Sequence, residues 1–199
     1  MKGLITKDLL TIASHKMYFI MIAIFVLIPD QFLGNFAIVF AAMLPITAIA
    51  YDERSKWQEL ESMMPYSNKD KILSKYLLAY MLVFAVLVLS IVVHSILALF
   101  ISEYKELVNV SLMAIVVSVA LIIIAINLPF IFKLGVEKGR FVFIGLSVLI
   151  VMLGTNLNSF SDVIKIGNNV QYYLFIIAAI INIASIMISY KINYKKCRN

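Results

Sequence analysis

The residues that could perform chemistry are few and widely separated. Only two histidines and one cysteine are available as soft metal ligands, and the histidines lie 79 positions apart. A zinc site needs three or four such ligands, usually in close sequence pairs. The sequence also contains no G-x-S-x-G or H-E-x-x-H motif and no P-loop, G-x-x-x-x-G-K-[ST]. We therefore expect no metal, no cofactor and no catalytic residue on this chain.

Uncharged polar side chains are scattered through the longest apolar stretches, where Asp, Glu, Lys and Arg are absent. Such groups in lipid normally face other helices or a cavity. Each can line a transport pathway, or it can form an interhelical hydrogen bond worth about 0.6–2 kcal/mol. Transporters driven by an ion gradient usually keep a carboxylate at mid-membrane, and none is present. The pathway candidates are Ser90, His94, Ser118, Asn127, Asn182 and Ser185.

A polar loop, residues 52–74, contains a second group of candidates. Its apolar residues recur at i, i+3, i+6 and i+7, which predicts one face of a short helix that ends before Pro65. Ser67 and Asp70 then form a capping box that opens the next helix. The short helix can dock on a cytosolic partner or lie on the membrane surface. Its apolar face consists of Trp57, Leu60, Met63 and Met64.

The composition identifies the elements that must position these residues. Hydrophobic residues make up 63% of the 199 residues and charged residues only 14%, with a mean hydropathy of +0.99. Soluble domains average about 45–50% apolar and about 25% charged residues. A soluble enzyme, a disordered chain and a nucleic-acid binder are therefore excluded, and the chain is predicted to be a single all-α integral membrane domain spanning residues 1–199.

Six stretches without charged residues predict six transmembrane helices, since about 20 apolar residues cross the hydrocarbon. The alternation expected of barrel strands is absent, and this favours helices. The loop 154–169 can be plain or re-entrant. The predicted spans are about 17–33, 35–51, 75–101, 108–132, 141–157 and 170–190.

The basic residues predict the orientation. With six spans, 15 of the 17 Lys and Arg residues fall on the side that holds both termini. This is a strong positive-inside signal, so both termini are predicted to be cytoplasmic. The net charge of +6 then reflects topology and requires no nucleic acid. The 14 Lys to 3 Arg, with abundant Ile and Asn, favour a bacterial plasma membrane.

The N-terminal segment, residues 1–16, precedes the first span and is amphipathic. Ile5, Leu9 and Ile12 share its apolar face, whereas Lys7 and Asp8 lie opposite. This pattern predicts a helix in the plane of the lipid headgroups, where membrane lipid is its partner. The alternative is a cytosolic extension of the first span.

Two segments contain recognisable motifs. The first predicted cytoplasmic loop has an acidic pair, Asp52-Glu53, followed by Arg54, and Glu59 lies further along it. A Met64-Pro65-Tyr66-Ser67-Asn68-Lys69 stretch and a Lys75-Tyr76-Leu77 entry into the third span follow. This loop resembles that of the ABC-2 type permeases, with Met64 where the family usually has Leu, and the Lys7-Asp8-Leu9 run resembles the N-terminal helix of the same family.

The resemblance implies that residues 1–16 form an interfacial elbow helix and that the helix near 55–64 couples to a separate cytosolic ATPase, which binds ATP and magnesium. It also implies pairing of two six-span subunits, as a homodimer or with a paralogue. Related small permeases export amphipathic peptides, such as phenol-soluble modulins or bacteriocins, or give immunity to them.

The sequence thus predicts the permease subunit of an ABC exporter, which is not itself an enzyme. Two alternatives from other classes are a membrane scaffold or immunity subunit that transports nothing, and a passive channel.

Overall fold

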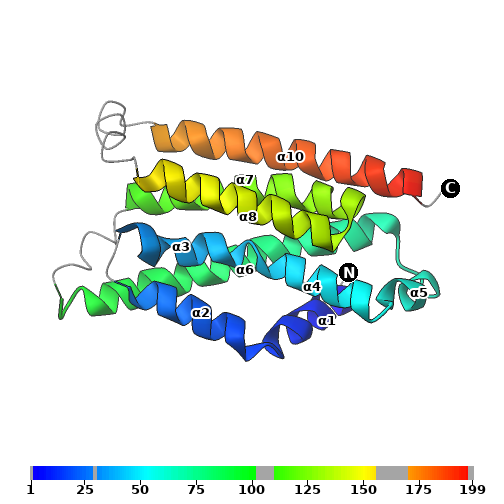
Figure 1. The fold of residues 1–199 in the computed structure, drawn as a ribbon, viewed down its shortest axis with the longest axis horizontal. Helices are drawn as coiled ribbons and strands as arrows, with labels where there is room; N and C mark the ends of the chain where they lie inside the picture. Colours follow the sequence, from blue (N-terminus) through cyan, green and yellow to red (C-terminus); the bar gives the residue numbers. More distant parts are fainter. Residues whose placement is uncertain (1, 29–30, 102–109, 156–169, 197–199) are drawn as a thin grey trace.

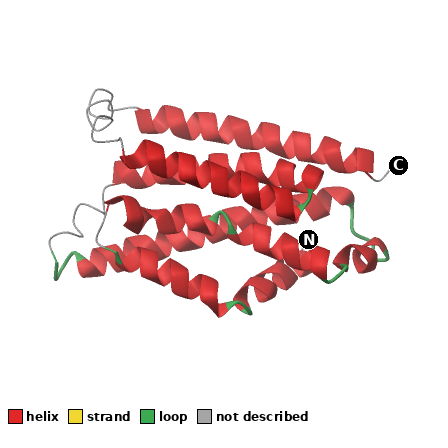
Figure 2. Cartoon of the chain, in the orientation of Figure 1, coloured by secondary structure: helices red, strands yellow, loops and turns green. Residues whose placement is uncertain are grey.

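The computed structural model describes residues 2–28, 31–101, 110–155 and 170–196, and within these ranges every regular element is an α-helix (Figures 1 and 2). The helices are α1 Lys2–Ala13, α2 Lys16–Leu27, α3 Gln31–Ala41, α4 Leu44–Arg54, α5 Trp57–Ser62, α6 Asn68–Leu97, α7 Val110–Leu134, α8 Val136–Thr155 and α10 Val170–Lys196.

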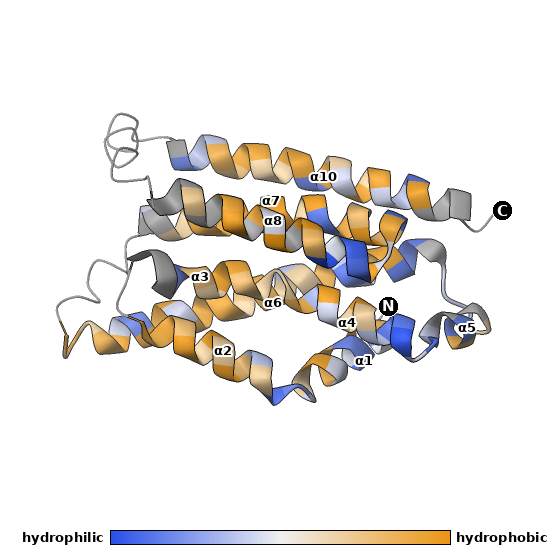
Figure 3. Ribbon diagram, in the orientation of Figure 1, coloured by the Kyte–Doolittle hydropathy of each residue, from blue (hydrophilic) through white to orange (hydrophobic). Residues whose placement is uncertain are grey.

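The long helices run side by side and give the molecule two distinct ends (Figure 1). The start of α1, the end of α10, the turn between α7 and α8, and α5 all lie at one end. The hydrophilic residues of the described chain gather there, while the helices between the two ends are mostly hydrophobic (Figure 3). We call this the polar end of the bundle.

Four helical segments of the described chain are long and apolar enough to cross a membrane, and α1 with α2 makes a fifth if this pair, bent by 74°, is one broken span. The fold is therefore a multi-pass helical membrane bundle, with four to five candidate spans where the sequence predicted six. The four segments are Asn35–Arg54, Lys69–Leu97, Met113–Leu134 and Gln171–Ile192.

The helix in the first predicted span is shorter than expected. The sequence predicted a helix over 17–33, but α2 ends at Leu27 after 12 residues, or about 18 Å at 1.5 Å per residue. Ile28 adopts an extended backbone, with φ −78° and ψ 123°. Proline at the next position, Pro29, explains this ending, because it disfavours helical geometry in the residue before it.

The second predicted span, 35–51, consists of two helices. α3 ends at Ala41 and α4 begins at Leu44, with Pro45 in its first turn, where the missing N–H costs nothing. Together they form the most enclosed of the candidate spans. Small side chains allow neighbouring helices to approach this segment closely; those that are buried are Ala37, Ala41, Ala42, Ala48 and Ala50.

The boundaries of the remaining helices follow from local signals. The N-cap Ser67 accepts a hydrogen bond from the backbone N–H of Lys69, which confirms the predicted start of α6. Gly135, with φ +84°, makes the turn between α7 and α8, so α8 begins five residues before the predicted 141. Gly139 then lies against Ile131 so closely that a Cβ would overlap it. Most of the 154–169 loop lies outside the described residues.

Candidate functional site

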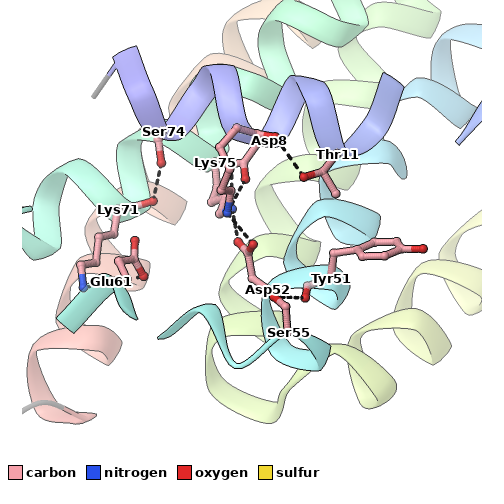
Figure 4. A network of polar contacts seen from close by, with 10 residues as sticks. Asp8, Thr11, Tyr51, Asp52, Ser55, Glu61, Lys71, Ser74 and Lys75 are labelled. Atoms are coloured by element: carbon pink, nitrogen blue, oxygen red, sulfur yellow. Dashed lines mark hydrogen bonds and ion pairs between the residues drawn. The ribbon is translucent and has the colours of Figure 1, made fainter. Parts of the chain in front are cut away.

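Four charged side chains meet at the polar end in a closed square of ion pairs (Figure 4). The Lys7 Nζ lies 2.9 Å from Asp8 Oδ1 and 2.5 Å from Asp52 Oδ1. The Lys75 Nζ lies 2.7 Å from Asp8 Oδ2 and 2.6 Å from Asp52 Oδ2. We call Lys7, Asp8, Asp52 and Lys75 the charge square. It joins α1, α4 and α6, three helices that are distant in the sequence.

The charge square is enclosed by protein. The side chain of Asp8 is 0% exposed and those of Lys75 and Asp52 are each 13% exposed. A buried charge is tolerated only when it is paired and hydrogen-bonded, and here two lysines balance two aspartates. The prediction that Asp8 lies on the outer polar face of its helix is wrong: α1 buries Leu4, Asp8 and Ile12, because Asp8 pairs with lysines from α1 and α6.

The electrostatic surroundings favour the charged form of Lys7. Burial lowers the pKa of its ammonium, but hydrogen bonds to Asp52 and Asp8 and the charges of both carboxylates outweigh burial, and the pKa is raised above its ordinary value of 10.5. Because the folded pKa of Lys7 lies above its ordinary value of 10.5, the Lys7 charge contributes stability that is fully present below that ordinary value. This contribution of Lys7 is lost as the pH rises through the folded pKa.

The short helix α5 is held at both ends. Lys56, just before it, adopts a left-handed backbone with φ +52°, which makes the sharp turn out of α4. Trp57 lies half-buried, with the Lys7 Nζ 4.6 Å from its ring centroid. At the other end, Glu61 lies 3.7 Å from the Nζ of Lys71 on α6. Tyr66 also comes close to Gly3 on α1, because a Cβ on that glycine would lie 3.3 Å from the Tyr66 hydroxyl.

The residues predicted to share one apolar face separate into two groups. Trp57 turns towards Lys7, whereas Leu60, Met63 and Met64 point outward and are 51%, 82% and 38% exposed. The helix ends at Ser62, so the two methionines lie in the turn after it. We call Leu60, Met63 and Met64 the exposed edge. The exposed edge thus leaves three large apolar side chains uncovered at the polar end.

The predicted acidic and basic members of this loop also differ in their positions. Asp52 points inward to the charge square. Glu53, Arg54 and Glu59 are exposed, and the Glu53 carboxylate lies beside the Gly135 turn, 3.7 Å from where a Cβ on that glycine would be.

Deeper in the bundle, two of the pathway candidates take part in hydrogen bonds that link α6, α7 and α10. Pro129 lies inside α7 and has no N–H, which frees the carbonyl of Ala125 four residues earlier. The Ser185 hydroxyl donates to that carbonyl at 2.6 Å. Tyr76 Oη lies 2.6 Å from Ser185 Oγ and 2.8 Å from Ser189 Oγ, which forms a chain of hydroxyls ending on the freed carbonyl.

Asn182, one turn earlier on α10, likewise links a backbone carbonyl of α7 to a tyrosine of α6. Its amide nitrogen donates to the Leu121 carbonyl at 3.0 Å and to the Ala178 carbonyl at 2.8 Å, and its amide oxygen accepts from Tyr80 Oη at 2.8 Å. The polar groups of Asn182 and Tyr80 and the two carbonyls are thus hydrogen-bonded inside the protein, as the apolar surroundings require.

The other four pathway candidates are also buried. His94 Nε2 lies 3.0 Å from the Val26 carbonyl, so it must carry the proton, and it caps the last turn of α2. The Ser118 hydroxyl donates to the Ala114 carbonyl in its own helix at 2.7 Å. Ser90 Oγ and both amide atoms of Asn127 have no hydrogen-bond partner among the described residues.

The described residues contain no group of three or more His, Cys, Asp or Glu side chains that could hold a metal ion. The charge square cannot bind one either, because its own lysines already occupy both carboxylates.

The fold is that of a multi-pass helical membrane protein whose hydrophilic residues gather at one end (Figure 3). Residues 3–197 match the family described as ABC-2 family transporter protein, so the chain belongs to the ABC-2 transporter family. Its class is that of the membrane subunits of ABC transporters, which normally work with a cytosolic ATPase. Searches of curated proteins and of solved structures gave no match.

Sequence reasoning missed three of the four members of the charge square. It singled out Asp52, but assigned Lys7 and Asp8 to a solvated helix face and treated Lys75 only as the entry to a span. The available signal was the position of Asp8, which shares the i, i+4, i+8 face of α1 with Leu4 and Ile12. An acidic residue in the middle of an apolar helical face indicates a buried partner of opposite charge.

The first prediction concerns the charge square. Asp8→Ala leaves Lys75 and Lys7 with one carboxylate between them, and breaking a buried pair in this way costs about 3–5 kcal/mol. We expect a clear fall in the thermal midpoint of the purified protein in detergent. Glu53→Ala, one residue after Asp52 and exposed, is the matched control and should leave the midpoint nearly unchanged. Equal midpoints for the two variants would contradict the buried square.

The second prediction concerns the carbonyl freed by Pro129. Ser185→Ala removes its donor and should cost about 1–3 kcal/mol, the penalty for an unsatisfied buried group. Pro129→Ala restores a backbone N–H to the Ala125 carbonyl. The double variant should therefore be more stable than Ser185→Ala alone, as judged by denaturation in detergent. If the two losses simply add, Ser185 does not compensate for the proline.

Proposed function

We propose that this chain is the permease subunit of an ABC exporter in a bacterial plasma membrane. The exposed edge of α5 carries the proposal: three large apolar side chains point away from the bundle at its polar end, beside a loop similar to the coupling loop of ABC-2 permeases. In this proposal α5 seats in a cleft of a separate cytosolic ATPase, which binds ATP and magnesium. ATP-driven closure of the ATPase moves α5 and so alters access to the space between the helices.

The proposed arrangement has six spans, with both termini in the cytoplasm. The polar end, which contains α5, the start of α1 and the end of α10, is then the cytoplasmic end (Figure 1). The concentration of Lys and Arg on this side in the six-span reading supports this orientation. Six spans form half of a usual ABC pathway, so two copies, or this chain and a paralogue, pair in the membrane.

The proposed cargo is an amphipathic or antimicrobial peptide, on the basis of the resemblance to small peptide-exporting permeases. A scaffold or immunity subunit would keep the ATPase contact without transport, and a passive channel would conduct without an ATPase. Only an exporter, among these three, therefore moves a substrate in a way that depends on ATP hydrolysis by the ATPase.

The third prediction tests the exposed edge. Leu60→Ala with Met63→Ala removes two exposed apolar side chains while leaving Trp57 and the charge square in place. If the edge is an interface hot spot, the loss is about 2 kcal/mol or more, roughly a 30-fold rise in the Kd for the ATPase. The measurement is titration of the full chain, in nanodiscs, with the ATPase that co-purifies with the unaltered chain.

The matched control is Leu10→Ala with Met17→Ala, the same two residue types, 66% and 70% exposed on α1 and α2. This control should leave the Kd within twofold. Unchanged affinity in the α5 variant would show that the edge lies on the membrane surface. In that case Met63→Lys would be harmless, since anionic lipid attracts cations.

The fourth prediction tests the topology. In a chain carrying Cys197→Ser, Ser55→Cys and Lys138→Cys should resist a membrane-impermeant thiol reagent in intact cells. Lys105→Cys and Asn158→Cys should react with it, because the six-span reading places them outside. Labelling of Lys138→Cys in intact cells would overturn the six-span arrangement.

A further inference from the structure

Lys7 occupies the point at which the charge square meets α5. Its ammonium lies 2.5 Å from Asp52 Oδ1 and 2.9 Å from Asp8 Oδ1, and it also lies 4.6 Å from the centre of the Trp57 ring. One side chain of α1 therefore contacts α4 and α5 at the same time.

We infer that Lys7 is a positioning residue, which sets the orientation of the exposed edge by fixing the Trp57 ring against α1. The inference rests on the proposed function in so far as the exposed edge is taken to bind the ATPase. It does not make Lys7 part of the docking surface, since Lys7 is largely enclosed, with a side chain 23% exposed.

The first argument is the short length of α5. A helix of six residues has no stability of its own in water, because isolated helices below about 12–15 residues are marginal. Its position must therefore come from contacts with the rest of the protein. At its far end there is one ion pair, Glu61 with Lys71, with a separation of 3.7 Å. At its near end the contact is Lys7 with Trp57.

The second argument is that no hydrogen bond orients the indole. The Trp57 Nε1 atom is buried and has no hydrogen-bond partner among the described residues. The Lys7 ammonium over the ring face is therefore the directional polar contact that the described residues give the indole. Cations are attracted to the face of tryptophan more strongly than to other aromatic rings.

The third argument is that the cation itself cannot swing away. Two carboxylates hold Lys7 Nζ, and each of them is held in turn by Lys75. Leu60 and Met63 follow Trp57 by three and six residues, along α5 and the turn after it. A rotation of the α5 backbone that moves the indole off the cation therefore also turns the exposed edge. The square thus acts as a fixed support for the edge.

Trp57 is the single tryptophan of the chain, so its fluorescence reports on this contact directly. The experiment compares the full chain in nanodiscs as Lys7→Met, Lys7→Arg and Lys2→Met. Lys7→Met keeps most of the stem but removes the charge, and it leaves both carboxylates with Lys75 alone, so a fall in stability is expected beside the change at the indole. Lys2→Met is the matched control, since Lys2 is an exposed lysine on the same helix.

In Lys7→Met we expect the acrylamide quenching constant of Trp57 to rise at least twofold and the Kd for the co-purifying ATPase to rise about 3- to 30-fold, from the strength of cation–π contacts. Lys7→Arg should restore both readings and Lys2→Met should change neither. An unchanged quenching constant in Lys7→Met would overturn the inference. If the exposed edge does bind the ATPase, increased quenching with a Kd that stays within twofold would overturn it as well.

A second variant keeps the test valid if Lys7→Met does not fold. Trp57→Leu removes the same contact and leaves the charge square intact, so the Kd should rise about 3- to 30-fold, and a Kd within twofold of the unaltered chain would overturn the inference. Where Lys7→Met does fold, the double variant should raise the Kd no further than either single variant. Fully additive effects would mean that the two residues act separately. The quenching measurement requires no ATPase and therefore tests the Lys7–Trp57 contact by itself. Failure of the docking proposal would appear separately, as an unchanged Kd for Leu60→Ala with Met63→Ala.

Discussion

The buried carboxylate of Asp8 is the constraint on which the polar end depends. A charge with no exposed surface must be balanced nearby, and here that balance comes from lysines on two helices. Lys75 lies in the second turn of α6 and Asp52 near the end of α4, so these two helices can place their charges against α1 only in one relative arrangement. The square therefore fixes how α1, α4 and α6 meet, and the turn into α5 starts from that fixed point, three residues after Asp52.

In the apolar part of the bundle, buried uncharged polar groups also need partners inside the protein. Pro129 frees a backbone carbonyl where no water is available, and the hydroxyls of Ser185, Tyr76 and Ser189 satisfy it in sequence. Because Ser185 donates to the carbonyl, it must accept its other hydrogen bond from Tyr76, which in turn accepts from Ser189. Each hydroxyl therefore donates to one defined partner, and these hydrogen bonds hold α6 and α10 in register against the turn of α7 that contains Pro129.

Much of the fold could be predicted from the sequence, because it depends on local or one-dimensional signals. Apolar length predicted the segments that became α6, α7 and α10, and the Ser67 cap predicted the start of α6. The shorter first helix follows from Pro29, a local signal that charge-free length alone overlooks. The membrane class also follows from composition, and the family from the motifs of the loop 52–74.

The candidate site was less accessible to sequence reasoning, for a physical reason. Lys75 and Asp8 are 67 positions apart, and helical periodicity indicates which face of a helix is apolar but not which other helix covers it. Sequence reasoning could place Trp57 on the same apolar face as Leu60 and Met63. It could not predict that a lysine of α1 would hold the indole inward.

This division of the apolar face gives a very short helix one inward anchor and leaves three apolar side chains exposed. If all four apolar residues pointed outward, α5 would have no apolar contact with the bundle, and binding a partner would have to pay for ordering it. With Trp57 used as an anchor, that ordering is already done, and only Leu60, Met63 and Met64 remain to meet a partner. The anchor rests on Lys7, and Lys7 rests on two carboxylates that belong to different helices. In the proposed mechanism, a displacement of α5 passes first to α1 and α4, and through Lys75 to α6. The charge that makes Asp8 costly to bury is thus also what connects the exposed edge to a helix long enough to cross the membrane.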